Sequence, residues 1–555
     1  MPRVQRGIVV PAPLGQARDN VVVTPLQVGA PTPAAPASAA AAPYGPAVAA
    51  RFAEPSTQYS TPGLAPERRG FTTNSELGQW LHNIANAAPR GPTQASVLQL
   101  GASQQGEPIL GLLLTRAKGM DMASLEANGR STVVLIGQQH GDEPAGSEAL
   151  LVVARELAQG LLEPLLDRIN VVVIPRANPD GATNGNRTTA NGVDMNRDHL
   201  LLNTPEARAL ARVVRDYRPI LVLDAHEFTV AGRYLQKFNA IQRYDALLQY
   251  TTTANYHEFL TKASQEWYHQ PMLGALQSQG MSSEWYYTTS TQPDDKRISM
   301  GGVQPDTGRN VNGLKNAVSL LVETRGVGLG RLHIQRRVHT QVTTITSALR
   351  STAERAADLE QVRSYVARDT ASKACKGQVV IEAQATPMQR ELTMLDPDTG
   401  ADRTLKVDWN SSLALRPVKS RPRPCGYWLA AHATAAVERL QMLGVQVLRI
   451  AEPGALLADT YHETARETTE RTDVRGTIAG GSSIIRTQVT PVRSAIDVPA
   501  GSFYVPLNQG LAHLAVAALE PDTQSSYFAN RLIDELGSTA RVMTVPSLVF
   551  EESDE

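Results

Sequence analysis

Five short apolar runs, separated by longer helical patterns, constrain the fold of this chain most strongly. They read ILGLLLTRA, STVVLIG, NVVVIP, ILVLDAH and NAVSLLVETRG, and begin at Ile109, Ser131, Asn170, Ile220 and Asn316. Continuous apolar runs of this length suit strands that are buried on both faces of a parallel or mixed sheet. Strands that alternate with helices predict a layered α/β domain, here a mostly buried mixed sheet flanked by helices.

The segments between these runs carry helix signals. NSELGQWLHNIANAA spaces its apolar residues as an amphipathic helix does. In TPEARALARVVRDYRP, Thr204 is a candidate N-cap, Pro205 suits the first helical position and Pro219 follows the end. A longer helical pattern over 330–368 is expected to close the domain.

The chain has 555 residues, which is too many for one hydrophobic core. Residues 1–70 are rich in alanine and proline and predict a flexible lead-in, because such a segment buries too little apolar surface to offset its ordering entropy. The α/β domain is expected over 71–368. Shorter alternating segments with Pro and Gly punctuation then predict a smaller, strand-rich α+β domain over 369–555.

The net charge of the chain argues against nucleic acid and anionic membranes as partners. A formal net charge of −1 gives no electrostatic footprint for nucleic acid or an anionic membrane. No run approaches the roughly 18 apolar residues of a membrane span. The N-terminal apolar patch is too short and too interrupted by proline for a secretory signal, whereas the Ala/Pro-rich lead-in favours a periplasmic or secreted location. A cytoplasmic location is the alternative, and the sequence gives no indication of oligomeric state.

Cysteine is rare in this chain. Cys375 and Cys425 are the two cysteines, which excludes a disulfide scaffold and a thiolate zinc cluster. One bridge and two free thiols both remain open.

Metal-capable side chains follow three of the five apolar runs. His140 and Glu143 come after the run that begins at Ser131, His226 ends ILVLDAH, and Glu323 lies in SLLVETRG. Ligands of α/β domains bind beyond the carboxyl ends of the strands, so these side chains can meet at one edge. Two imidazoles and a carboxylate suit Zn²⁺ with an open position for water, and the remaining carboxylate could accept a proton from that water.

A series of motifs in a fixed order then identifies a resemblance. HGDE at His140, NPDG at Asn178, RTTANGVDMNRD at Arg187, DAHEF with His226 and VETRG with Glu323 together resemble the zinc metallocarboxypeptidases of the M14 (funnelin, carboxypeptidase A-like) family. The resemblance covers about residues 71–365. The stretch PAGSFYVPLNQGLAHLAVAALEPD further resembles the terminal module of some long bacterial members, whose role stays open.

The resemblance implies a zinc hydrolase that cleaves the peptide bond next to a free C-terminal carboxylate. It implies one Zn²⁺ per chain, held by His140, Glu143 and His226. Glu323 would act as general base on the metal-activated water and then as general acid to the leaving amine.

Residues 187–197 would complete the site in this resemblance. Arg187 would polarise the scissile carbonyl and stabilise its oxyanion. Asn196 and Arg197 would hold the free carboxylate of a peptide or peptide-like substrate, and Asp194 would orient His140. Gly192 leads into this segment and is expected to allow its turn.

Three questions stay open in the sequence. Family members usually carry a Tyr about two dozen residues before the catalytic Glu, and that window has none here, so Tyr286, Tyr287 or neither takes this role. The resemblance also places the specificity pocket in this window. Asp306 and Arg309 are both charged there and would favour terminal side chains of opposite charge, so the sequence does not choose between them. The alternative functions are a zinc deacylase of acylated amino acids and an amidase acting on cell-wall peptides.

Overall fold

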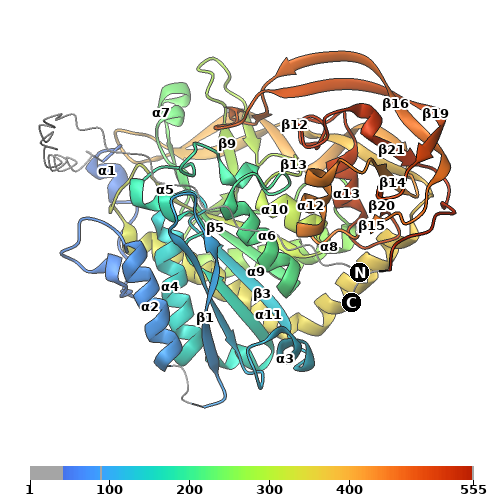
Figure 1. The fold of residues 1–555 in the computed structure, drawn as a ribbon. Coiled ribbons are helices and arrows are strands. Elements are labelled where there is room, and N and C mark those ends of the chain that lie inside the picture. Colours follow the sequence, from blue (N-terminus) through green and yellow to red (C-terminus); the bar gives the residue numbers. More distant parts are fainter. Residues whose placement is uncertain (1–41, 88–90, 553–555) are drawn as a thin grey trace, which may run out of the picture. The chain divides into compact units, whose positions relative to one another are not determined.

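The computed structural model describes residues 42–87 and 91–552 of the chain, and its main feature is an eight-stranded sheet (Figure 1). In spatial order the strands are β1 (Gln94–Ala102), β2 (Pro108–Thr115), β4 (Ile169–Ile174), β3 (Ser131–Gly137), β5 (Leu221–Thr229), β11 (Val318–Val327), β7 (Ala246–Tyr250) and β8 (Ser283–Trp285). All five apolar runs form strands of this sheet, which confirms the predicted mixed α/β architecture.

The centre of the sheet is parallel. Strand β3 pairs in parallel with β4 and β5, and β5 pairs in parallel with β11. Strands β1 and β2 pair antiparallel at one side, and β7 pairs antiparallel with β11 at the other. The carboxyl ends of the four central strands therefore meet at one edge of the sheet.

Helices cover both faces of the sheet, because alternate residues of each buried strand point to opposite sides. On one face, Val133 and Leu135 of β3 pack in a cluster with α2, α4, α8, α9 and α11. On the other, Val134 of β3 packs with Leu210 of α6. The helices of the two faces are α2 (Asn74–Ala87), α4 (Pro144–Gln159), α8 (Glu258–Ala263), α9 (Gln270–Ser278), α11 (Ile334–Ser372) and α6 (Pro205–Tyr217).

The predicted helix signals are confirmed. The Thr204 hydroxyl accepts a hydrogen bond from Ala207 N at the start of α6, and Pro205 occupies the first helical position. The long closing helix is also present, but it ends at Ser372, four residues beyond the expected end at 368.

Two further sheets contain the strands of the C-terminal region. One has the order β6-β12-β13-β10-β9, and the other the order β15-β20-β14-β21-β16-β19. Their strands are β6 (Ile241–Gln242), β12 (Gln378–Leu395), β13 (Asp402–Pro422), β10 (Ile298–Met300), β9 (Tyr287–Thr289), β15 (Leu448–Arg449), β20 (Phe503–Pro506), β14 (Gly426–Leu429), β21 (Thr539–Val542), β16 (Gly454–Thr469) and β19 (Ile484–Val498). The first of these sheets joins strands from both sides of the boundary predicted at 368, so the domain limits stay predictions.

The remaining elements are short. The hairpin of β17 (Thr472–Asp473) and β18 (Gly476–Thr477) lies between β16 and β19. The other helices are α1 (Pro46–Ala49), α3 (Met122–Ala127), α5 (Pro179–Asn184), α7 (Arg233–Phe238), α10 (Gly308–Leu314), α12 (Thr434–Met442) and α13 (Ala512–Leu519), with short turns η1 (Pro62–Leu64), η2 (Glu163–Asp167), η3 (Met195–Arg197), η4 (Ser264–His269) and η5 (Leu536–Ser538).

Residues 42–70 differ from the flexible lead-in expected for 1–70, of which 1–41 lie outside the described residues. Val48 and Phe52 are buried in a cluster with Trp409, and the Arg325 guanidinium lies 3.4 Å from the centre of the Phe52 ring. Glu148 of α4 accepts hydrogen bonds from the Thr61 hydroxyl and from the backbone and side chain of Thr72. These sparse apolar and hydroxyl side chains anchor a segment whose overall composition is that of a linker.

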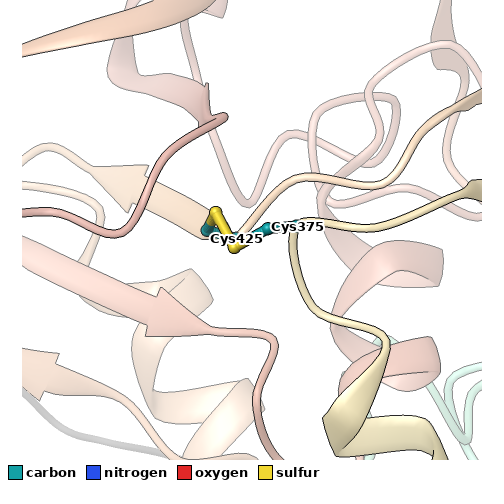
Figure 2. Close-up of a disulfide and its surroundings, with 2 residues drawn as sticks. All are labelled: Cys375 and Cys425. Carbon is teal, nitrogen blue, oxygen red and sulfur yellow. A yellow bond between two sulfur atoms is a disulfide. The ribbon is translucent and has the colours of Figure 1, made fainter.

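The two cysteines form a disulfide (Figure 2). Cys375 follows α11 and Cys425 precedes β14, with a Cα–Cα distance of 4.2 Å. The bridge therefore joins the last helix of the α/β part to the C-terminal sheet. Within the described ranges, no helix is both long enough and apolar enough to cross a membrane.

Candidate metal centre and active site

The candidate site lies at the carboxyl edge of the central strands. His140 and Glu143 lie in the connection between β3 and α4, while His226 and Glu323 lie within β5 and β11. His226 and Glu323 are register partners in these two parallel strands, so both side chains leave the same face of the sheet. Gly141 lets this loop pass close to the backbone of Gly181. A Cβ at position 141 would lie 1.9 Å from the backbone carbon of Gly181, so a larger residue does not fit there.

Three side chains converge on one point at this edge. Nδ1 of His140 lies 2.8 Å from Oε1 of Glu143, and Nδ1 of His226 lies 2.8 Å from Oε2 of Glu143. The two Nδ1 atoms are 3.1 Å apart. All three residues are buried, and they form a group of the size that holds one metal ion.

The outer nitrogens of both imidazoles face carboxylates. Nε2 of His140 lies 3.1 Å from Oδ1 of Asp194, and Nε2 of His226 lies 2.9 Å from Oδ2 of Asp224. A proton on each Nε2 satisfies these contacts and leaves both Nδ1 lone pairs directed at the Glu143 oxygens. A cation between these acceptor atoms would offset their mutual repulsion, and the carboxylate–histidine pairs are of the kind that supports bound zinc. The donor set therefore fits Zn²⁺.

The charges around the candidate ligands also favour a bound cation. Burial opposes a charge on His226, but the carboxylates of Asp224 and Glu143 outweigh it and raise the pKa of His226 well above its usual value. Burial likewise opposes ionisation of Asp194, yet Arg187 and His140 hold the pKa of Asp194 well below its usual range. The carboxylates around His226 therefore favour a positive charge at this point of the site.

Arg187 lies beside the three candidate ligands. Its Nε and Nη2 donate to Oδ2 of Asp194 at 3.0 and 2.9 Å. Its Nη1 lies 3.2 Å from Nδ1 of His140 and donates to Oε1 of Glu143 at 3.4 Å. Asp194 thus holds both His140 and Arg187, and one end of the guanidinium is directed at the ligand cluster.

The segment after Arg187 turns sharply to reach the site. Gly192 has a φ of +83°, a left-handed conformation that favours glycine, which agrees with the turn expected there. Nδ2 of Asn196 lies 3.2 Å from Nε2 of His226, and its Oδ1 accepts a hydrogen bond from Gly308 N. Arg197 donates through Nε and Nη2 to Oδ2 of Asp473, at 3.0 and 2.6 Å.

A cavity of about 190 Å³ lies against the candidate ligands. Its lining brings together most of the predicted site residues, among them His140, Glu143, Arg187, Asn196, Arg197 and Glu323. Burial, with the nearby Glu143 carboxylate, raises the pKa of Glu323 to about 7. A carboxyl group with this pKa can accept and return a proton near neutral pH.

The structure distinguishes residues that the sequence leaves open. Both tyrosines line the cavity, but Tyr286 lies near Glu323, whereas Tyr287 is buried between Tyr234 and Trp409. Arg309 lines the cavity too.

Asp306 is instead held in a buried ion pair. Its Oδ2 accepts a hydrogen bond from Nη2 of Arg471 at 3.0 Å.

Several residues at the site were not among those predicted to act in it. Asp224 follows from the period of two on the strand of His226, so that signal was present in the sequence. His199 is buried against Gln139, whose amide reaches Asp224, and burial lowers the pKa of His199 to about 4. Asp473 and Arg475 come from the C-terminal region, and no local pattern in the sequence marks them.

Comparisons of the sequence with known proteins agree with this geometry. Residues 78–298 match the family model described as zinc carboxypeptidase, Peptidase_M14. The chain is 27% identical over 399 residues to Carboxypeptidase 2 of Trichophyton rubrum, covering 71% of this chain and 72% of that protein. It is 26% identical over 482 residues to Carboxypeptidase 2 of Trichophyton equinum, covering 85% of this chain and 87% of that protein. A carboxypeptidase A structure from Helicoverpa armigera aligns with 15% identity and a TM-score of 0.38, over 53% of this chain and 78% of that one.

The family match covers the strands and loops that carry His140, Glu143, Arg187 and His226. The fungal relatives extend the similarity into the C-terminal region, since their alignments cover more of the chain than the α/β part alone. Members of this family use zinc, and the His140, Glu143 and His226 group is the metal-capable cluster found among the described residues. Residues 78–298 are therefore similar to the M14 zinc carboxypeptidase domain, and this similarity, with that to the fungal carboxypeptidases, identifies the protein as a hydrolase.

Proposed function

We propose that this protein hydrolyses the last peptide bond of substrates with a free C-terminal carboxylate, with Glu323 as the proton-transferring group. The observation that supports this most directly is the shared cavity. It is lined by two of the candidate metal ligands, by Glu323 and by a set of arginines that can receive an anion. Zinc held by His140, Glu143 and His226 would supply a Lewis acid that polarises the carbonyl and lowers the pKa of water.

Glu323 is suited to move the proton. Its carboxylate takes a proton from the attacking water and delivers it to the nitrogen of the leaving amine. Its register with His226 fixes the carboxylate next to the cluster, on a strand that is buried on both sides. A base on a rigid strand needs little reorganisation before the reaction.

Arg187 is suited to stabilise the negative charge that develops on the carbonyl oxygen. Asp194 occupies Nε and Nη2 of this guanidinium and leaves Nη1 beside the cluster. A donor held in place before the reaction stabilises a developing oxyanion more than a mobile one does.

Asn196, Arg197 and Tyr286 all line the cavity in which the terminal carboxylate is expected to bind. We assign Tyr286, rather than Tyr287, to the position that covers bound substrate. Tyr287 is enclosed by Tyr234 and Trp409 and has 1% of its surface exposed.

A substrate panel tests the proposed function. Blocked dipeptides with a free carboxylate, the same dipeptides with a C-terminal amide, and N-acyl amino acids are each incubated with zinc-loaded protein. Release of the terminal residue from the free-carboxylate peptides alone is the expected result. Turnover of the N-acyl amino acids alone would replace the proposal with a deacylase.

We further propose that the protein works in an oxidising compartment, in keeping with an exported location. The Cys375–Cys425 disulfide supports this, because disulfides persist in such compartments and are rare in the cytosol. Fractionation of the producing cells, with antibody detection, should place the mature protein outside the cytoplasm.

A further inference from the structure

The C-terminal region contributes side chains to the active-site cavity. Val474 and Arg475 line the cavity together with His140 and Glu323, although they lie about 150 residues beyond the last predicted site residue. Both belong to the turn of the β17–β18 hairpin, which lies at the end of the long β16–β19 hairpin. In Figure 1 that long hairpin extends from the C-terminal sheet toward β9 of the α/β part.

Contacts from several directions fix this turn over the site. Thr291 donates to the carbonyl oxygen of Arg475 from both its backbone and its hydroxyl, at 2.8 and 3.0 Å. Asp194 N donates to the carbonyl oxygen of Ala479 at 3.2 Å. Arg471 donates to Asp306 and to the carbonyl oxygen of Arg197. Hydrogen bonds to residues of the site therefore hold the turn and its flanking residues in place.

Asp473 forms an ion pair with the guanidinium of Arg197. Nε and Nη2 of Arg197 both donate to Oδ2 of Asp473, and Nη1 donates to the carbonyl oxygen of Asn196 at 2.7 Å. Asp473 is itself held by a hydrogen bond from Arg475 N to its Oδ1 at 2.7 Å. Nε and Nη2 of Arg197, one of the N–H pairs with which an arginine can bind a carboxylate, are thus already engaged.

Among the residues that the structure describes, no carboxylate is hydrogen-bonded to the guanidinium of Arg475, which lies at the cavity. Its nearest carboxylate oxygens, on Asp194 and Asp473, each lie 3.7 Å away, beyond hydrogen-bond distance. Burial, together with the neighbouring cations Arg187 and Arg197, lowers the pKa of Arg475. An anion bound in the cavity would relieve this repulsion and could accept two hydrogen bonds from the planar guanidinium of Arg475.

We propose that Arg475 binds the terminal carboxylate of the substrate directly, while Asp473 engages Arg197 and positions it beside the site. This inference rests on the proposed carboxypeptidase function and names a further substrate-binding residue for it. It also gives the C-terminal region a role, because the region completes the site that recognises the end of the peptide.

Arg475→Ala and Arg475→Lys test the proposal in the full-length, zinc-loaded enzyme. For a blocked dipeptide with a free carboxylate, Arg475→Ala should raise KM by about tenfold or more with kcat changed far less, since a charge-assisted hydrogen bond is lost. Arg475→Lys should recover part of that loss. Arg493→Ala, which removes an exposed arginine of β19 paired with Asp459, should leave both constants unchanged.

A double variant separates substrate binding from a structural effect. Asp473→Ala in the Arg475→Ala background removes the acceptor that engages Nε and Nη2 of Arg197 and should reverse at least part of the rise in KM. A structural defect would instead worsen, and thermal unfolding of each variant reports folding independently.

The outcomes distinguish this inference from the proposed function. A KM for Arg475→Ala equal to the wild-type KM would overturn it while leaving the carboxypeptidase function intact, as would no recovery in the double variant. Wild-type protein that fails to turn over any free-carboxylate peptide would overturn the proposed function itself.

Discussion

Nε2 of His226 lies 2.9 Å from Oδ2 of Asp224, two residues earlier on the same strand. The two side chains share a face of the sheet because of the period of two in a strand. Asp224 also accepts a hydrogen bond from the Gln139 amide at 2.6 Å, so the carboxylate is fixed from two sides. His226 is thereby held with Nδ1 toward Glu143 and His140, in the orientation that a metal ligand needs.

Asp224→Asn is therefore expected to weaken zinc binding by about 10- to 100-fold, as loss of such a supporting carboxylate does. Competition of the protein with a chelator of known affinity measures the effect. Asp216→Asn, an exposed position on α6, is the matched control and should bind zinc as the wild type does. Unchanged zinc affinity in Asp224→Asn would show that the Asp224 contact does not support the ligand.

Glu323→Gln should retain zinc and lose turnover. The substitution keeps the size of the side chain but removes the group that accepts the proton, so kcat is expected to fall by about 10²-fold or more. Zinc content and kcat are measured on the same preparation. Glu467→Gln, an exposed change on β16, is the control, and wild-type turnover in Glu323→Gln would exclude the proposed proton transfer.

The acidity of Glu323 also predicts a pH profile. Burial raises the pKa of this carboxyl to about 7, and a bound cation would favour its ionised form. Since the base acts only when ionised, kcat/KM should fall on the acidic side, with its midpoint at or below pH 7. A kcat/KM that stays flat from about pH 8 down to pH 5 would contradict a carboxylate base with this environment.

The parts of the fold and site that the sequence predicts are those set by local patterns. His140, His226 and Glu323 each follow or end an apolar run, and parallel strands bring such positions to one edge regardless of the loops between them. Asp473 and Arg475 could not be predicted, because only the tertiary path of the β16–β19 hairpin brings them to that edge. The packing of 42–70 was missed because its anchors, such as Val48 and Phe52, are few within an Ala/Pro-rich composition.

His269 is expected to make stability depend on pH. Its ring stacks on Trp285 at a centroid distance of 3.8 Å, and neither nitrogen has a hydrogen-bond partner among the described residues. Burial lowers the pKa of His269 to about 4, whereas the unfolded chain takes up the proton near 6.5. The free energy of unfolding should therefore be highest above about pH 6.5 and should fall as the pH drops toward 4, with a contribution on the order of 1–3 kcal/mol.

His269→Phe keeps the stacked ring and removes the two unpaired nitrogens. Its unfolding free energy should change less between neutral and acidic pH than that of the wild type, as measured by denaturant titration at each pH. The slope should not vanish, because burial also lowers the pKa values of His199 and His513. The exposed His462→Phe should keep the wild-type slope, and an unchanged slope in His269→Phe would contradict this assignment.

The disulfide is expected to stabilise the folded chain. Cys375 and Cys425 are 50 residues apart, and a bridge of this length restricts the unfolded chain by about 4 kcal/mol on the chain-entropy model. The double variant Cys375→Ser/Cys425→Ser should lose stability of this order in a urea titration. A reducing agent should lower the stability of the wild type and leave the double variant unchanged; equal responses would mean that the bridge is not formed.

The charge of Arg309 predicts which terminal residue is preferred. Arg309 is buried and lines the cavity, and its guanidinium donates to the carbonyl oxygen of Gly302 at 2.9 Å but forms no ion pair with a carboxylate in the part of the chain described. Asp306, the opposite charge nearby, is neutralised by Arg471. Of these two residues, Arg309 is the one whose charge is available at the cavity, which favours an acidic terminal side chain over a basic one.

Dipeptides that end in Glu, Lys and Leu distinguish the possible preferences. We expect kcat/KM to be about tenfold or more higher for Glu than for Lys, from one charge-assisted contact made with Glu and one repulsion avoided. Arg309→Gln should reduce that ratio mainly by lowering kcat/KM for Glu, while the Leu substrate serves as the internal control because it has no charge to pair. A preference for Lys in the wild type would mean that a carboxylate of the cavity, rather than Arg309, selects the terminal residue.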